Sequence, residues 1–280
     1  MLRIGLIGTE NSHTDHFVRH LNVDEGYEGC RVVALAGGDT EKNRKLAADG
    51  RIEQIVESAE DLLELVDAAV VSDRHGGLHA QNAVPLLEAG KHVFVDKPTA
   101  VTVSDTEAII AAAQRGGAVL ASWSAVRLSP GVTQLRDAAA QLGELQVVTV
   151  AGPADPDDPH AGLFFYGPHV VEPALELLGN PDIDDVHVDH VAHAVTVTAR
   201  ANGIQLVLIF VRPDDHGRVP WHISVTGRHG VVADDIGLGE DYNARSIARF
   251  LDAVKSGVPP MPYEQLLPPV RLLETVTTQL

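Results

Sequence analysis

A charged pair, Asp96 and Lys97, ends an apolar run of this chain and is followed at once by Pro98. The run at residues 92–95 predicts a buried strand, and the proline prevents that strand from continuing. The carboxyl end of a parallel strand is where open α/β sheets bind their ligands. An ammonium group held there can donate a hydrogen bond to a reacting oxygen and stabilise developing negative charge. We therefore predict that Lys97 is the chemical centre of the protein. The alternative is a solvated ion pair at the end of a strand.

The elements that must position Lys97 follow from apolar periodicity. Short apolar runs alternate with helix-like segments through the first half of the chain. The runs occupy residues 3–7, 32–36, 68–71, 92–95 and 119–123. Capping-box spacing at Ser58 with Asp61, and at Ser104 with Glu107, predicts two helix starts among them. The alternation indicates an α/β fold, a Rossmann-type doubly wound parallel sheet over residues 1–122 that binds a dinucleotide.

The second half of the chain carries longer runs in which apolar and polar residues alternate. Residues 186–200 and 204–212 flank Asn202-Gly203, a strong signal for an antiparallel hairpin. Further strands are expected at residues 145–151, 221–226 and 230–234, and helices near 169–178, 243–256 and 263–279. We predict a C-terminal α+β domain with a mostly antiparallel sheet over residues 123–280, for substrate binding and oligomerisation. An open sheet face in this domain suits a homo-oligomer, a dimer or a tetramer.

Composition narrows the class of protein. The chain has 280 residues, of which 45% are hydrophobic, and a net charge of −18, so it offers no basic face to nucleic acid or to an anionic membrane. A single cysteine, Cys30, rules out an internal disulfide. No apolar run is long enough to span a membrane, and strand-like sequence begins at once, so we expect a cytoplasmic protein. The histidines lack converging carboxylates, and no metal is expected.

The first strand leads into a loop that stands in the frame of the dinucleotide fingerprint G-x-G-x-x-G. The loop residues are Gly8, Thr9, Glu10, Asn11, Ser12 and His13. Only the first glycine is present, because Glu10 and His13 replace the other two. At the end of the second strand, where an acid normally binds ribose, the chain has Gly37, with Asp39 two residues on. Asn11, Ser12 and the N–H groups of the helix start can still hold a phosphate. The alternative is a Rossmann-like fold whose nucleotide site has been reshaped or lost.

Residues 87–98 are similar to the EAGKHVxxEKP signature of the Gfo/Idh/MocA oxidoreductases, with Asp96 in place of glutamate. His79 matches the histidine of the family's TPNxxH loop, and Arg127 matches the arginine that follows the sixth strand. Residues 167–172 resemble the helix start that carries the family's active-site histidine, here His169. Residues 250–260 resemble the closing FLDAVRxGxPP segment. These similarities recur in the family's order over nearly the whole chain.

The resemblance implies an NAD- or NADP-dependent oxidoreductase that acts on a secondary alcohol or ketone of a sugar-, inositol- or polyol-like small molecule. It implies that Lys97 binds the reacting oxygen and that His169 is the general base. Asp96 is expected to orient the lysine. Arg127 is expected to bind substrate, with an interdomain salt bridge as the alternative. The residues expected at the cofactor are Gly8, Thr9, Glu10, Asn11, Ser12, His13, Gly37, Asp39, Asp73, His79 and Lys97.

Two departures from the family pattern leave alternatives open. The family frequently has an aspartate four residues before the histidine, where this chain has Phe165 beside Tyr166. Glu172, one helical turn beyond His169, is a candidate to orient the imidazole instead. Tyr166 is a candidate proton donor, with simple packing as its alternative. Two other functions remain possible: a non-catalytic ligand sensor that has lost dinucleotide binding, and a redox-assisted eliminase or epimerase.

Overall fold

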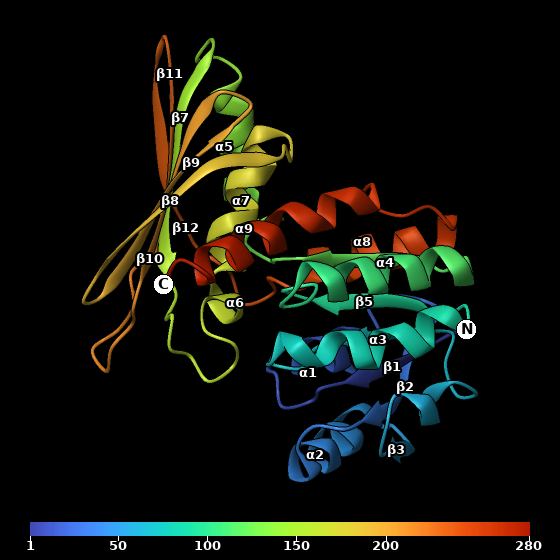
Figure 1. Ribbon diagram of the computed structural model, residues 1–280. Coiled ribbons are helices and arrows are strands. Elements are labelled where there is room, and N and C mark those ends of the chain that lie inside the picture. The colour runs from blue at the N-terminus through green and yellow to red at the C-terminus, as the bar shows by residue number, and fades with distance from the viewer. The chain divides into compact units, whose positions relative to one another are not determined.

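Two six-stranded sheets organise the 280 residues that the computed structural model describes (Figure 1). Each sheet is the centre of one unit of the chain. The first unit comprises Met1–Ser122 with Asn243–Tyr263, and the second comprises Trp123–Tyr242 with Glu264–Leu280. Residues 243–263, expected in the second domain, therefore cluster with the first. The reason is packing, because Phe250 lies against Phe94 with ring centroids 5.9 Å apart.

The first sheet has the strand order β3-β2-β1-β4-β5-β6. Its strands are β1 (Leu2–Ile7), β2 (Cys30–Ala36), β3 (Gln54–Val56), β4 (Ala68–Val71), β5 (His92–Asp96) and β6 (Leu120–Trp123). The pairs β3–β2, β2–β1, β1–β4 and β4–β5 are parallel, and β4 is wholly buried, as expected for a strand covered on both faces. The predicted parallel doubly wound sheet is confirmed. The order reverses between β1 and β4, and open sheets bind ligands at the carboxyl ends of strands at such a point.

Helices connect these strands, and their starts correct two predictions. The helices are α1 (His13–Val18), α2 (Thr40–Gly50), α3 (His79–Glu88), α4 (Val103–Gly116) and α8 (Ala244–Ser256). Thr102 caps α4 in place of Ser104, because its hydroxyl accepts the N–H of Asp105 at 3.0 Å. Ser58 and Asp61 do form a hydrogen bond of 2.8 Å, but only the 3₁₀ turn Glu60–Leu62 follows. Packing explains the missing helix, because Leu62 is fully buried where Gly5 leaves room for it.

The second sheet has the order β12-β11-β7-β10-β9-β8. Its strands are β7 (Leu145–Pro153), β8 (Ile183–Val191), β9 (Ala194–Ala201), β10 (Ile204–Val211), β11 (Trp221–Gly227) and β12 (Gly230–Ile236). Only β7 and β10 pair in parallel, so the predicted mostly antiparallel sheet is confirmed. Asn202 and Gly203 both have positive φ, as the predicted hairpin turn requires. The expected strand at 186–200 is in fact two strands, β8 and β9.

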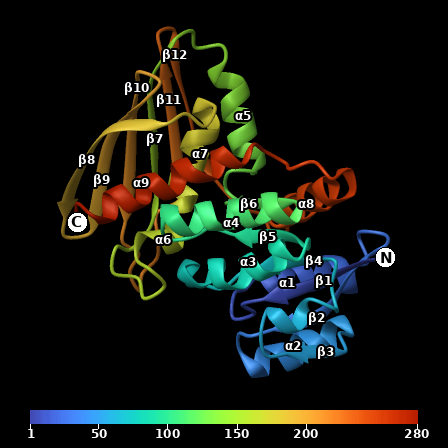
Figure 2. The same ribbon diagram turned by 45° about the vertical axis from the view of Figure 1, so that its right-hand side comes forward.

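Helices lie on one face of the second sheet and leave its other face without any (Figures 1 and 2). They are α5 (Pro130–Ala139), α7 (Pro168–Leu178) and α9 (Leu267–Thr277), with the short α6 (Leu163–Tyr166) before α7. Alternation along the strands matches this arrangement, because β9 and β10 bury every second residue. The buried residues of β10 include Leu206, Leu208 and Phe210, which together with α7 build the core of the second unit.

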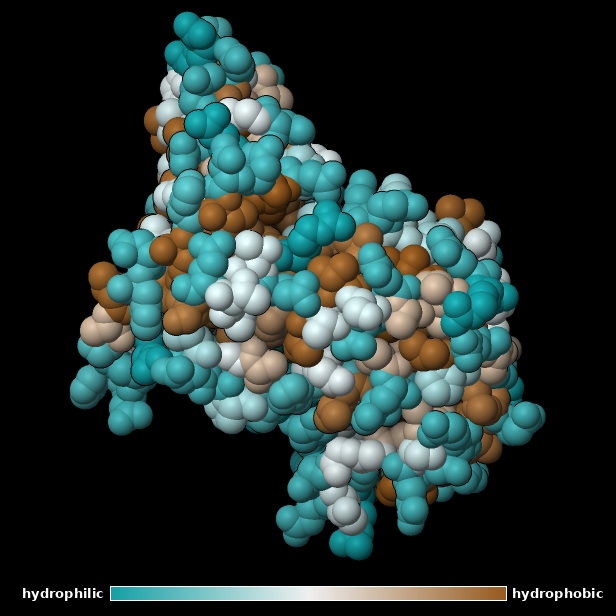
Figure 3. Space-filling model, viewed as in Figure 1, coloured by the Kyte–Doolittle hydropathy of each residue, from teal (hydrophilic) through white to brown (hydrophobic).

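The surface of the chain is mainly polar. Hydrophilic side chains dominate the face drawn in Figure 3, with apolar groups between them. Large apolar residues that are exposed, such as Val23, Val191, Val231 and Val258, lie far apart in the sequence. None of the helices combines the length and the apolar composition that a membrane span requires.

Candidate functional site

The loops at the carboxyl ends of β1 and β4 meet at the point where the strand order reverses. Gly8 ends β1 with a φ of +73°, a conformation that favours glycine. A Cβ at Gly8 would lie 2.2 Å from the backbone nitrogen of Asp73, which follows β4. Glycine is therefore required here by close backbone approach. The first glycine of the fingerprint thus joins two loops of the sheet.

Asp96, at the end of β5, is the centre of a buried polar cluster. Its Oδ2 lies 2.7 Å from Nδ1 of His13 and accepts a hydrogen bond of 3.2 Å from Nδ2 of Asn11. Asn11 also accepts the backbone N–H of His13 at 3.1 Å. Both ends of the Asn11 amide are therefore used within the loop, so Asn11 holds His13 and Asp96 in place. The histidine that replaces the third glycine binds the carboxylate beside Lys97.

The electrostatics of this cluster favour an ionised Asp96. Burial by itself would raise the pKa of the Asp96 carboxyl. The positive charge of His13, the hydrogen bond from its ring and the charge of Lys97 outweigh burial, so the pKa lies below its usual range. Asp96 and Lys97 are only 4% and 5% exposed. An anionic Asp96 behind Lys97 keeps the lysine charged and directed from a rigid strand end.

His79 connects the loop after β4 to the loop after β5. Its Nδ1 lies 2.7 Å from the carbonyl oxygen of Pro98, and its Nε2 lies 2.9 Å from the carbonyl oxygen of Asp73. The ring is fully buried, so His79 does not reach a cofactor, contrary to the expectation from sequence. His79 fixes the two loops that flank Lys97.

Asp73 is also largely enclosed. Its Oδ2 accepts a hydrogen bond of 2.9 Å from Asn82 on α3. Burial raises the pKa of its carboxyl, the Asn82 hydrogen bond opposes that shift, and the negative charge of Glu10 adds to it. Asp73 and Glu10 are therefore close enough to interact, and they make this edge of the sheet acidic.

Among the remaining loop residues, Glu10 is the one whose charged side chain extends across the ends of the strands. Its Oε1 accepts the backbone N–H of Arg74 at 2.9 Å. Thr9 is fully buried, with its hydroxyl 3.5 Å from the carbonyl oxygen of Gly37, so its side chain does not reach a cofactor either. Ser12 is exposed, and its hydroxyl makes no capping bond to α1. The loop is thus organised by side chains where the fingerprint has glycines.

The end of β2 is a tight turn with no carboxylate on the strand itself. Gly37 and Gly38 have φ values of +59° and +69°. Asp39 caps α2, because its Oδ1 accepts the N–H of Lys42 at 2.7 Å. The Lys42 ammonium donates to the carbonyl oxygen of Asn11 at 2.6 Å and pairs with Asp15 at 2.8 Å. The lysine nearest this turn is therefore already engaged.

These loops fit the adenosine end of a dinucleotide. Gly8 and Gly38 let the loops pack closely, since a Cβ at Gly38 would lie 2.3 Å from the Thr9 hydroxyl, whereas a Cβ at Gly37 would meet no atom within 4 Å. Oε2 of Glu10 is buried and faces no hydrogen-bond donor of the chain. A buried acceptor without a donor costs about 1–3 kcal/mol, so a ligand hydroxyl at this position would be favoured. The residues that would hold the cofactor are Gly8, Glu10 and Gly38.

In the second unit, His169 lies in the first turn of α7 and is 5% exposed. Its Nδ1 lies 2.6 Å from Oγ of Ser124, which follows β6. Ser124 Oγ also accepts the N–H of Val126 at 3.1 Å, and the Ser124 N–H donates to Oε2 of Glu172 at 2.7 Å. The hydroxyl of Ser124 is therefore the group bound to Nδ1 of the imidazole. Glu172, expected to orient the imidazole, anchors the backbone of Ser124.

Aromatic rings enclose the His169 ring on two sides. Tyr166 and Trp221 pack edge-on against it, with ring centroids 5.5 and 5.4 Å away. The guanidinium of Arg218 lies over the Trp221 ring at 5.4 Å and donates a hydrogen bond of 3.3 Å to the Tyr166 hydroxyl. Tyr166 thus combines packing with a polar contact. The cluster brings a cation, a phenol and an imidazole together within one unit.

Arg127 has a different position from the one expected. Its side chain is 3% exposed; Nε donates to Glu176 at 2.9 Å and a terminal nitrogen donates to Asn180 at 2.9 Å. All three residues belong to the second unit. The substrate-binding role expected of Arg127 stays a prediction. The side chain ties α7 to the loop that follows it.

Sequence reasoning missed Ser124, Arg218 and Trp221. Ser124 stands 45 residues from His169, and no local spacing connects the two. Arg218 lies in the polar connection between β10 and β11, where nothing distinguishes it from its neighbours. The only available signal is that Ser124 follows the last strand of the parallel sheet, where ligand-binding groups gather.

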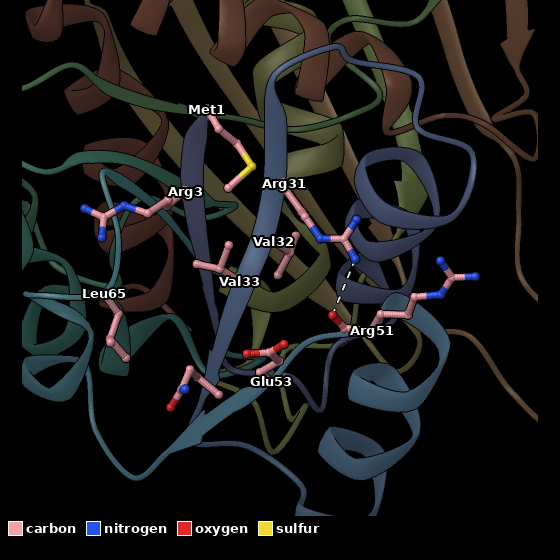
Figure 4. Close-up of a pocket in the computed structure, with 9 residues that line it drawn as sticks. Met1, Arg3, Arg31, Val32, Val33, Arg51, Glu53 and Leu65 are labelled. Carbon is pink, nitrogen blue, oxygen red and sulfur yellow. Dashed lines mark hydrogen bonds between the residues drawn. The ribbon is translucent and has the colours of Figure 1, made fainter.

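A pocket of about 270 Å³ lies away from these clusters, at the opposite edge of the first sheet (Figure 4). It is lined by Met1, Arg3, Arg31, Val32, Val33, Arg51, Glu53, Gln54 and Leu65. Arg3 pairs with Asp67 at 2.7 Å, and Arg31 donates to the carbonyl oxygens of Gly50 and Arg51. Several of these residues lie near the starts of β1, β2 and β3, whereas the candidate site lies where strands end, so the pocket does not belong to the candidate site. No group of three or more His, Cys, Asp or Glu side chains is placed to hold a metal ion.

Comparison with known proteins supports the NAD-binding character of the first unit. Residues 2–124 match a family described as "Oxidoreductase family, NAD-binding Rossmann fold". A 1,5-anhydro-D-fructose reductase from Ensifer adhaerens is 30% identical over 143 residues, which cover 50% of this chain and 41% of that protein. An inositol 2-dehydrogenase from Gluconacetobacter diazotrophicus is 33% identical over 118 residues, 41% of this chain and 34% of that protein. The matched stretches therefore span less than half of these relatives.

A solved structure has the same fold over nearly the whole chain. The structure of GenD2 from gentamicin A biosynthesis, in complex with NAD, superposes with a TM-score of 0.85 at 20% identity. The match covers 98% of this chain and 93% of that one. At this identity the likeness concerns the fold, and it extends to the second unit, which the family match does not reach.

Proposed function

Since the chain belongs, through residues 2–124, to the Gfo/Idh/MocA oxidoreductase family, we propose that it is an NAD- or NADP-dependent dehydrogenase or reductase. Its substrate is a secondary alcohol or ketone of a sugar-, inositol- or polyol-like molecule. The names of its relatives, an anhydrofructose reductase and an inositol dehydrogenase, support this substrate class. The observation that carries the proposal is the buried Lys97 at the end of β5, backed by the ionised Asp96.

Lys97 acts on the reacting oxygen of the substrate. Its ammonium donates a hydrogen bond and stabilises negative charge as that oxygen becomes an alkoxide. The carboxylate of Asp96, the residue before Lys97, is held in place by Nδ1 of His13 at 2.7 Å. The nicotinamide, when bound, supplies or accepts the hydride. The chain's part is to hold the oxygen and its charge in place.

His169 moves the proton of the substrate hydroxyl. A base needs a free lone pair, and Nδ1 is occupied by Ser124 at 2.6 Å. We assign the basic role to Nε2, which requires that Nδ1 carries hydrogen and donates it to Ser124 Oγ. A hydroxyl oxygen can accept two hydrogen bonds, so it accommodates both Nδ1 and the N–H of Val126. Ser124 is in this way compatible with the tautomer that makes His169 a base.

The second candidate function is a ligand sensor on the same fold. Glu10 favours it, because a carboxylate stands in the loop where the fingerprint brings a pyrophosphate close to the backbone. A sensor keeps a substrate pocket without binding nicotinamide. Cofactor binding therefore discriminates between the two functions.

Two measurements on the full chain test the proposal. Titration with NADH and with NADPH, followed by nicotinamide fluorescence, is expected to give saturable binding well below about 1 mM, as in other dehydrogenases. Turnover is then measured on a panel of inositols, 1,5-anhydro-D-fructose and related polyols, in both directions. If neither cofactor binds, the dehydrogenase is ruled out and the sensor is favoured. Binding without turnover of any panel member would contradict the proposed substrate class.

The homo-oligomer is also a proposal. The face of the second sheet that carries no helix presents side chains such as Val207, Ile209 and Thr198, which are half-buried. A second copy of the chain packed on this face would cover them. Light scattering of the purified chain is expected to give a dimer or a tetramer, and a monomeric mass would contradict this.

A further inference from the structure

We propose that Glu10 supplies the carboxylate that binds the adenosine ribose and that it makes the protein specific for NAD(H) over NADP(H). This inference rests on the proposed function, since it concerns the cofactor of the same site. It assigns to the first loop a task that Rossmann-type sheets normally give to an acid at the end of the second strand.

The position of the carboxylate is fixed from two sides. Oε1 of Glu10 accepts the N–H of Arg74 at 2.9 Å, after β4. Oε2 points the other way, toward the turn after β2, because a Cβ built on Gly38 would lie 3.1 Å from it. The Glu10 carboxylate therefore lies across the end of β1, beside the residue where a ribose-binding acid would be expected. Gly37, at that strand end, has no side chain to perform the task.

The hydrogen-bonding state of Glu10 points to a hydroxyl as its ligand. Oε2 is buried, and the chain offers it no donor. An ionised carboxylate only accepts hydrogen bonds, so its partner must be a donor such as a ribose hydroxyl. The neighbour Asp39 is less suited, because its Oδ1 already caps α2.

The surrounding charges explain the preference for a ribose without phosphate. Asp73 lies close enough to Glu10 for the charge of Glu10 to raise its pKa, so two acids share this edge. The Lys42 ammonium is bound by Asn11 and Asp15. A 2′-phosphate would therefore meet carboxylates, while the lysine nearest the turn after β2 is already paired with Asp15, and like-charge contacts disfavour the phosphate.

The test is an equilibrium titration of the full chain with NADH and NADPH, in the wild type and in Glu10→Gln. The wild type is expected to bind NADH at least about tenfold more tightly than NADPH, because tenfold corresponds to ~1.4 kcal/mol, less than one like-charge contact. Glu10→Gln keeps the shape and removes the charge, so NADH affinity falls about tenfold and the preference approaches one. Glu53→Gln, which removes an exposed carboxylate near the pocket at the opposite edge of the sheet, is the matched control and leaves both affinities unchanged.

The outcomes separate this inference from the proposed function. Equal binding of the two cofactors, or tighter binding of NADPH, overturns the role of Glu10 while the dehydrogenase stands. An unchanged preference in Glu10→Gln, with the unfolding midpoint also unchanged, overturns it as well. Failure of both cofactors to bind the wild type removes the proposed function together with the inference. Glu10→Ala, which also removes the hydrogen bond to Arg74, is expected to show the same loss of preference as Glu10→Gln.

Discussion

Lys97 in the first unit and His169 in the second are supported in different ways. Next to Lys97, the Asp96 carboxylate forms an ion pair with the His13 ring at 2.7 Å. The neutral hydroxyl of Ser124 lies 2.6 Å from Nδ1 of His169. The carboxylate of Glu172 binds the backbone N–H of Ser124 at 2.7 Å. In the proposed reaction, Lys97 must stay charged and lies next to a charged group. His169 must gain and lose a proton, and a neutral hydroxyl binds its ring.

This contrast has a physical basis. A carboxylate next to a lysine stabilises the ammonium in both protonation states of the substrate. A carboxylate in direct contact with an imidazole would favour the protonated ring and oppose its return to a base. A serine hydroxyl, which can donate or accept a hydrogen bond, binds the ring without adding that bias. The departure at Phe165, where the family frequently has an aspartate, is consistent with such a neutral arrangement.

The largest expected effect is on Lys97 itself. Lys97→Met removes the hydrogen bond to the reacting oxygen and is expected to lower kcat by about 10³-fold, as the loss of one oxyanion donor does. Cofactor affinity is expected to stay nearly unchanged. Steady-state kinetics and nicotinamide titration on the same sample measure both quantities. An unchanged kcat would show that Lys97 takes no part in the chemistry, and the comparison with His169 would no longer hold.

The charged support is expected to matter for stability as well. Asp96→Asn removes the buried carboxylate that pairs with His13 at 2.7 Å and lies next to Lys97, and breaking a buried pair in this way costs about 3 kcal/mol. The matched control is Asp67→Asn, which breaks the exposed pair with Arg3 and is expected to cost less than about 1 kcal/mol. Urea unfolding of both variants gives the two free energies. Equal losses would show that the Asp96 pair contributes no more than a surface pair.

The Ser124 hydroxyl, the neutral partner of His169, is expected to affect the rate and its pH dependence. Ser124→Ala removes the partner of Nδ1, so the imidazole loses a hydrogen bond that orients it, and kcat is expected to fall about tenfold. The acid limb of the kcat/KM profile is also expected to move, because the groups around the base have changed. A lower rate with an unmoved pH profile would mean that Ser124 only supports the packing of α7.

The smallest effect concerns His16, on α1 beside this cluster. Burial, followed by the charges of His13, Arg19 and His20, lowers the pKa of His16 from 6.5 to about 4. The unfolded chain therefore takes up this proton at a higher pH than the folded chain does, and stability is lost as the pH falls from about 6.5 to about 4. Allowing for the partial exposure of the ring, this loss is about 1 kcal/mol at pH 5. His16→Gln is expected to flatten the acid side of the stability curve by that amount. Urea unfolding at pH 7 and pH 5 measures this. An equal loss of stability in His16→Gln and in the wild type would contradict the prediction.

Sequence alone predicted most of the strands and named the candidate reactive groups. Strong apolar runs predicted β4 and β5, and the family signature around Lys97 and His169 named both residues as candidates. Their supports were out of reach, because His13 and Ser124 contact residues 83 and 45 positions away in the chain. Tertiary packing also overrode local signals, since Leu62 is buried where a capping box predicted a longer helix. The partners of Arg127, Glu176 and Asn180, could not be predicted for the same reason, because they became its neighbours only through folding.

The claim that Lys97 and His169 serve one reaction is tested most directly by a double-mutant cycle. Lys97→Met, His169→Gln and the double variant are assayed with the substrate that the panel identifies. Residues that act as a unit have strongly non-additive effects, so kcat of the double variant is expected to equal that of the slower single variant within about threefold. Losses that multiply in the double variant would contradict the account, because the two residues would then act in separate steps.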